Sequence, residues 1–220
     1  MIYQFWVIFL VLLVIFIFCD FKYGLLRDTS QAKPQPYSWG RVQLAWWTII
    51  IFAAFAGIFW KTGDLPELHY STIVLLGISA ATTTTARMID VSDQTNAAIR
   101  HQDLRASSFF LDIVSDQKGV SIHRFQAILF NAIFGIWFIA QVVGQMETCT
   151  GGTCINSIIP VIDNDNLMLL GLSAATYAAL KTTENPARPV TQNVPDSSPN
   201  TTTTITNTTT VPPATTGLNQ

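Results

Sequence analysis

The chain has 220 residues, of which 49% are apolar and only 12% are charged, and its formal net charge is −2. Soluble domains carry about 25% charged residues, so this composition excludes an ordinary soluble domain. Because Lys and Arg do not exceed Asp and Glu, the charge balance also argues against a dedicated nucleic-acid-binding protein.

Five apolar runs follow one another along the chain, and each is a candidate membrane span. About 20 apolar residues cross a hydrocarbon core of about 30 Å. The third and fifth runs are shorter and rich in Gly, Ala, Ser and Thr, so buried or re-entrant helices are an alternative for these two. The runs cover residues 2–19, 42–60, 70–86, 125–143 and 167–180.

The first run is expected to stay in the protein as an anchor. No basic residue precedes it, and no small-x-small cleavage site follows it, as a secretory signal would require. Phe18 directly before Cys19 also does not fit a lipoprotein signal.

The basic residues predict an orientation. Eleven of the twelve Lys and Arg residues lie in the first gap, the third gap and the C-terminal tail, and only Lys61 lies in the other two gaps. Cationic loops stay on the cytoplasmic side, so the pattern predicts five spans with the N-terminus outside and the C-terminus inside.

Two motifs recur in the same order and predict a duplicated two-helix unit. Residues 38–43 parallel 121–126, with Arg41 and Arg124 in equivalent places, at an offset of 83 positions. Residues 75–82 parallel 169–176 in seven of eight positions, at an offset of 94. Two spans return the chain to the same side, so these units are parallel repeats.

The small-residue spans are expected to form the packing centre, since small residues let helix backbones approach closely in lipid. The predicted packing residues are Gly77, Ala81, Gly171, Ala175 and Ala179. Nearby polar side chains either line a polar path or serve as packing hydrogen bonds. These candidates are Ser79, Thr82, Asn131, Ser173 and Thr176.

Cysteines and arginines supply the remaining candidate residues. Cys149 and Cys154 bracket a Gly-containing turn in the predicted outer loop, where a disulfide is favoured over free thiols. Cys19 lies at a membrane boundary and is expected to be inert. Arg41 and Arg124 are interpreted as helix anchors at the cytoplasmic interface, with lipid phosphate or a cytoplasmic partner as the alternative.

The largest segment between spans, residues 87–124, contains an expected amphipathic helix. Its apolar positions follow helical spacing, and residues 116–119 predict a turn that ends it. The helix is expected either in the membrane interface, packed on the bundle, or in a partner groove. The apolar positions are Ala106, Phe109, Phe110, Ile113 and Val114.

The stretch 110–126, followed by an apolar helix and the Leu-Leu-Gly-Leu-Ser-Ala-Ala-Thr span, resembles a family of uncharacterised bacterial polytopic membrane proteins. The resemblance covers about residues 37–182, and its most specific part is the Ser-x-His-Arg-Phe-Gln element at residues 121–126. The family's motif is like Leu-Ser-Asp-x-x-Gly-x-Ser-x-His-Arg-Phe-Gln, and this chain has Val114 at its first position. It implies a bacterial inner-membrane location and supplies no activity.

The sequence therefore predicts an all-α fold, a polytopic membrane bundle of five transmembrane helices with a duplicated two-helix unit, a cytoplasmic amphipathic helix and a disordered Thr/Pro/Asn-rich tail. Its expected segments are an anchor helix with a linker (1–36), the first two-helix unit (37–90), the cytoplasmic amphipathic segment (91–120), the second two-helix unit (121–184) and the tail (185–220).

Nothing in the sequence predicts catalysis. The expected spans contain no Asp, Glu or Lys, and the three histidines lie on different segments without zinc-ligand spacing. No nucleotide-binding or hydrolase motif occurs. We expect no catalytic, cofactor-binding or metal-binding residue, and hence a non-enzymatic membrane scaffold or membrane component of a larger assembly. The alternative is an oligomeric channel or pore.

Expected partners are the lipid bilayer, further copies or a partner membrane protein, and a cytoplasmic protein at residues 87–124, but no nucleic acid.

Overall fold

The computed structural model describes residues 1–28, 30, 33–96, 108–116, 119–149 and 152–184. The tail and part of the segment between the third and fourth runs, residues 97–107 and 117–118, lie outside these residues, including Ala106 of the expected amphipathic helix. The elements in chain order are α1 (Ile2–Tyr23), α2 (Trp39–Thr62), α3 (Tyr70–Thr95), α4 (Phe109–Val114), β1 (Ser115–Asp116), β2 (Gly119–Val120), α5 (Ile122–Thr148), the 3-10 helix η2 (Gly152–Ser157) and α6 (Asn164–Glu184).

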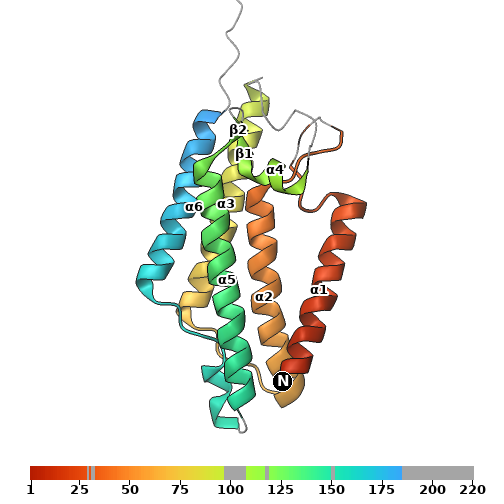
Figure 1. The fold of residues 1–220 in the computed structure, drawn as a ribbon, viewed down its shortest axis with the longest axis vertical. Coiled ribbons are helices and arrows are strands. Elements are labelled where there is room, and N and C mark those ends of the chain that lie inside the picture. The colour runs from red at the N-terminus through yellow and green to blue at the C-terminus, as the bar shows by residue number, and fades with distance from the viewer. Residues whose placement is uncertain (29, 31–32, 97–107, 117–118, 150–151, 185–220) are drawn as a thin grey trace, which may run out of the picture. The chain divides into compact units, whose positions relative to one another are not determined.

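The long helices pack side by side in a bundle (Figure 1). α1 packs on α2, α2 contacts α3 and α5, and α6 packs on both α3 and α5. Among the described residues, four helices are long and apolar enough to cross a membrane, namely α1, α2, α3 and α5. The fifth predicted run lies in α6, which has 21 residues and is less apolar than those four.

The helix termini fall into two groups. Figure 1 shows that α1, α3 and α6 end at the same side of the bundle at which α2 and α5 begin. Two glycines help to set this arrangement, because Gly24 and Gly63 end α1 and α2 with φ of 65° and 75°, a backbone conformation that other residues rarely adopt.

α1 touches the bundle mainly near its beginning. Phe5 is fully buried, whereas only 6% of the residues in the apolar stretch of α1 are buried. A Cβ on Gly57 would lie 3.1 Å from the Phe5 Cα, so the glycine allows α1 and α2 to approach closely at this point. Further along α1, Ile8, Phe9 and Leu12 are partly buried against the same core, and many of the other apolar side chains are exposed.

The centre of the bundle is built on large apolar side chains of α2 and α5. Trp47 and Phe138 are both fully buried and meet edge to face, with ring centroids 6.1 Å apart. Gly135 lies against the Trp46 indole, which occupies the space that a Cβ at this position would need. The two helices can therefore pack closely here only because residue 135 has no side chain.

At the end of the bundle where α2 and α5 terminate, the predicted pairing of Cys149 with Cys154 is present, with a Cα–Cα distance of 5.7 Å. The loop before α3 contacts the same region, since the Glu67 amide donates to Asn156 Oδ1 at 3.3 Å and His69 Nε2 lies 3.0 Å from the Asn156 carbonyl oxygen. The connection between α2 and α3 thus contacts the connection between α5 and α6.

Two boundaries differ from the sequence-based expectation. α3 continues to Thr95, well beyond the end of the apolar run at residue 86, because its polar last turns also pack against other elements. The amphipathic segment contains only a short described helix, α4, which is followed by the antiparallel pair β1–β2. Two residues of the expected turn at 116–119, 117 and 118, lie outside the described residues, and on their C-terminal side Gly119 has a φ of 110°.

Candidate functional site

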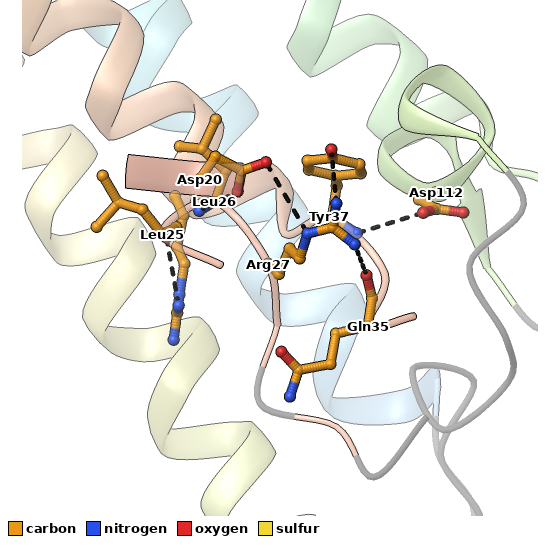
Figure 2. Close-up of polar contacts among 8 residues, drawn as sticks. Asp20, Leu25, Leu26, Arg27, Gln35, Tyr37 and Asp112 are labelled. Carbon is orange, nitrogen blue, oxygen red and sulfur yellow. Dashed lines mark hydrogen bonds and ion pairs between the residues drawn. The ribbon is translucent and has the colours of Figure 1, made fainter. Parts of the chain in front are cut away.

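Polar side chains gather at the side of the bundle where α1, α3 and α6 end. The connection between α1 and α2, residues 24–38, lies there and supplies several of them (Figure 2). We call this region the polar end of the bundle.

Arg27 organises the connection. Its Nη1 donates to the Gln35 carbonyl oxygen at 3.2 Å, and its Nη2 donates to the Tyr37 hydroxyl at 3.1 Å. Its Nε lies 3.9 Å from Asp20 Oδ2, and the other carboxylate oxygen of Asp20 accepts from the Leu26 amide at 2.9 Å (Figure 2). One guanidinium therefore holds the end of α1 and both sides of the connection in a fixed arrangement.

Tyr37 links this connection to α4. Its ring packs edge to face on Phe109 at a centroid distance of 4.9 Å, and its amide donates to Asp112 Oδ2 at 3.4 Å. Burial, reinforced by the negative charge of Asp20, raises the pKa of the Tyr37 phenol above its usual value. The phenol consequently stays neutral at physiological pH and remains a hydrogen-bonding partner of Arg27.

A buried ionic cluster connects three distant parts of the chain. Lys181 Nζ lies 3.0 Å from Asp90 Oδ2 and 4.0 Å from Asp28 Oδ2. The three residues are only 1%, 3% and 5% exposed in the order Lys181, Asp90, Asp28. Buried charges need a partner of opposite sign, and here one ammonium serves two carboxylates from α3 and the first connection.

The lysine also limits what this cluster can bind. Its ammonium already lies between the two carboxylates, where a metal ion would otherwise have to bind. Within the described residues, no group of three or more His, Cys, Asp or Glu could hold a metal ion. The chemistry that the cluster supports is ion pairing that joins α6 to α3 and to the connection between α1 and α2.

Arg41 and Arg124, equivalent in the sequence, lie in different surroundings. Arg41 is partly exposed and donates to the Leu25 carbonyl oxygen at a long 3.4 Å. Arg124 is only 6% exposed, and its Cζ lies 5.6 Å from the ring centroid of Tyr177 on α6. Arg124 therefore contributes to helix packing through a cation–π contact.

The small residues predicted to pack helices lie beside the contact between α3 and α6 rather than at its centre. Gly77, Ala81, Ala175 and Ala179 are exposed in the single chain, and no atom lies within 4 Å of a Cβ placed on Gly77. Gly171 is partly buried. Ala81, Gly171 and Ala175 border a groove of about 360 Å³ between the two helices.

The five predicted polar-lining residues lie in separate surroundings. Ser79 and Thr82 are buried and donate to the carbonyl oxygens of their own helix, at 3.1 and 2.7 Å. Asn131 is buried against α2, where its Oδ1 accepts from Trp47 Nε1 at 2.8 Å.

The remaining two residues, Ser173 and Thr176, border a small cavity of about 80 Å³ beside His123 and Gln126. Within the described part of the single chain, the structure brings these two together. Ser79, Thr82 and Asn131 do not border this cavity, and none of them forms a hydrogen bond to another of the three. Thr82 borders the groove between α3 and α6.

Sequence reasoning missed Lys181 and Asp90, although a signal existed. Arg87 and Asp90 follow the first copy of the repeated motif, and Lys181 and Glu184 follow the second copy at the same offset of 94 positions. Each copy of the repeated motif is followed by a basic residue and, three positions later, an acidic residue. This pattern indicates that both helices continue beyond their apolar parts and carry charges there that can form ion pairs.

Comparison of the chain with protein-family models, with curated proteins and with solved structures finds no match.

Proposed function

We propose that the chain is a non-enzymatic integral membrane protein of a bacterial inner membrane that forms oligomers and acts as a scaffold or as the membrane component of a larger assembly. α6 is the fifth span in this proposal, the N-terminus is outside, and the polar end of the bundle faces the cytoplasm. The distribution of charge supports this orientation, since Lys22, Arg41 and Arg124 belong to helix ends on one side and Lys61 to an end on the other.

Two contacts at closely corresponding positions support the duplicated unit. Thr83 Oγ1 donates to the Gly40 carbonyl oxygen at 2.8 Å, which joins the start of α2 to α3. Arg124 lies over Tyr177, which joins the start of α5 to α6. Tyr177 is 94 positions after Thr83, and Arg124 is 83 positions after Arg41, the residue that follows Gly40. The two contacts therefore lie within one residue of the positions that the sequence offsets relate.

The observation that supports a scaffold most directly is that buried polar groups bond to the chain itself. Lys181 pairs with Asp90, Asn131 accepts from Trp47, and Ser79 donates to its own helix. Groups arranged in this way stabilise a fixed bundle. The exposed small-residue face of α3 supports association, because such faces let helices of neighbouring chains approach closely in lipid.

The mass of the complex in native-like lipid discs tests this proposal. Gly77→Leu places a large side chain on the exposed face of α3 without an intrachain clash, and we expect it to reduce the mass of the complex. Gly144→Leu is the matched control, because a Cβ on Gly144 also meets no atom within 4 Å, on the different helix α5. A wild-type protein that is monomeric in discs would contradict the oligomeric scaffold.

The groove between α3 and α6 favours a second candidate, an oligomeric channel or pore. Thr82 and Thr85 border it among small apolar residues, so several copies facing a common axis would present hydroxyl groups there. A pore requires ion flux into liposomes that contain the protein and a ring with a central opening in images of the same sample. Thr82→Val keeps the side-chain shape and should then change the flux, whereas a scaffold would show no flux with either residue.

A further inference from the structure

A cavity of about 310 Å³ lies between the last turns of α1, the beginning of the connection that follows it, and the first turns of α2. Its wall is almost wholly apolar, and one charged side chain borders it. Besides Leu25, the lining residues are Phe16, Leu26, Arg41, Leu44, Ala45 and Thr48.

The polar groups around the cavity wall are already bonded elsewhere, apart from those of Arg41. Thr48 Oγ1 donates to the Leu44 carbonyl oxygen at 2.7 Å, so this hydroxyl is used within α2. The Leu26 amide donates to Asp20 Oδ1 at 2.9 Å. Asp20 is in turn paired with Arg27, so its negative charge does not oppose an anion nearby. The cavity therefore presents hydrocarbon with a single cationic group.

Arg41 has hydrogen-bonding capacity to spare. A guanidinium carries five N–H donors, and among the described residues the hydrogen bond that Arg41 makes is the long one to the Leu25 carbonyl oxygen. Arg27, in the same region, instead contacts Gln35, Tyr37 and Asp20. Arg41 is thus the arginine of this region that can offer a pair of parallel donors to the oxygens of a phosphate.

The cavity has a polar and an apolar end. Arg41 lies in the first turn of α2, and Thr48 is seven residues further along the same helix, about 10 Å away at 1.5 Å per residue. The cavity extends from the polar end of the bundle toward its apolar middle. Its volume is at the lower end of the range of about 300–1,000 Å³ for small-molecule sites, so it accommodates part of one hydrocarbon chain.

We propose that this cavity binds an anionic phospholipid, with the phosphate on Arg41 and part of an acyl chain along Leu44 and Ala45. The inference rests on the proposed membrane placement, in which this end of α1 and α2 lies at the level of lipid headgroups. The charge and the apolar wall together favour this ligand, because an amphiphile matches both and a free anion matches only the arginine.

Native mass spectrometry of the full chain in detergent, titrated with phosphatidylglycerol or phosphatidylcholine, tests the proposal. We expect the wild type to bind phosphatidylglycerol more tightly, and Arg41→Gln to weaken this binding about tenfold, the effect of losing a charge-assisted bidentate contact. Arg41→Lys keeps the charge without the bidentate geometry and should give an intermediate affinity. Lys61→Gln, at the opposite end of α2, is the matched control and should bind as the wild type does.

Filling the cavity tests the acyl-chain part. Ala45→Leu adds volume to the wall and should weaken phosphatidylglycerol binding without removing a charge, provided that circular dichroism shows unchanged helicity. If this variant fails to fold, the Arg41 series decides by itself. Excess inorganic phosphate should not displace the lipid, and displacement would indicate a simple anion site and overturn the proposal.

Equal phosphatidylglycerol affinity for the wild type and Arg41→Gln would also overturn it. Failure of the wild type to enter lipid discs would instead contradict the membrane placement itself. The two failures are therefore distinguishable.

Discussion

Lys181→Met removes the ammonium that lies between the Asp28 and Asp90 carboxylates while nearly preserving side-chain volume. Because all three residues are at most 5% exposed, the substitution leaves two negative charges in a region that water reaches poorly. Loss of one partner from a buried ion pair costs about 3–5 kcal/mol. For a helical region of this size, about 2–4 °C per kcal/mol converts this loss into a fall in Tm of roughly 6–20 °C.

Thermal unfolding in one detergent, followed by circular dichroism, measures the effect. Arg87→Met is the matched control, because Arg87 is exposed and occupies the equivalent position after the first motif copy. It should lower Tm by only a few degrees, as expected for an exposed charge. Replacing Asp28 and Asp90 by Asn in the Lys181→Met background should recover much of the loss, since the three charges of the cluster are then all removed. If Lys181→Met and Arg87→Met unfold at the same temperature, the buried ionic cluster does not stabilise the bundle.

Three further substitutions test other parts of the structure. Asn131→Ala leaves the buried Trp47 indole N–H without its acceptor and should destabilise the protein by about 1–3 kcal/mol, measured by the same thermal unfolding, whereas an unchanged Tm would exclude a role for this hydrogen bond. Gly135→Ala should separate α5 from α2, because its Cβ would overlap Trp46, and a change in tryptophan fluorescence should accompany the lower Tm. Replacing Cys154 with Ser should expose one additional thiol to maleimide in the unfolded, unreduced protein, and labelling of one thiol fewer in the variant than in the wild type would argue against the disulfide.

The sequence predicted the helical character and the disulfide between Cys149 and Cys154 because both depend on short segments. Length and apolarity of a run determine whether it can form a membrane-crossing helix, and the spacing of Cys149 and Cys154 in a Gly-containing loop permits a disulfide without information from the rest of the fold. Helix continuation beyond the apolar run was not predicted, because the polar last turns of α3 are stabilised by contacts with α6.

The polar end could not be predicted in the same way. Asp90 and Lys181 are 91 positions apart, and each alone has the appearance of a solvent-exposed charge beyond a span. The difference between Arg41 and Arg124 likewise depends on Tyr177, a residue of another helix. Repeated small residues indicated a close helix–helix approach, but the helical period alone does not determine whether Gly77 faces α6 or the surrounding lipid.

The ionic cluster has a consequence for the order in which the protein is made. Asp28, Asp90 and Lys181 emerge from the ribosome in that sequence, so both carboxylates are synthesised well before the ammonium that pairs with them. Helices α1, α2, α3 and α5 are apolar enough to enter a membrane early, whereas α6 is the least apolar of the long helices and brings the missing charge. We therefore expect α6 to complete the bundle as the last step of biogenesis, and nascent chains that stop before residue 181 to be inserted yet remain sensitive to proteases at the connection between α1 and α2.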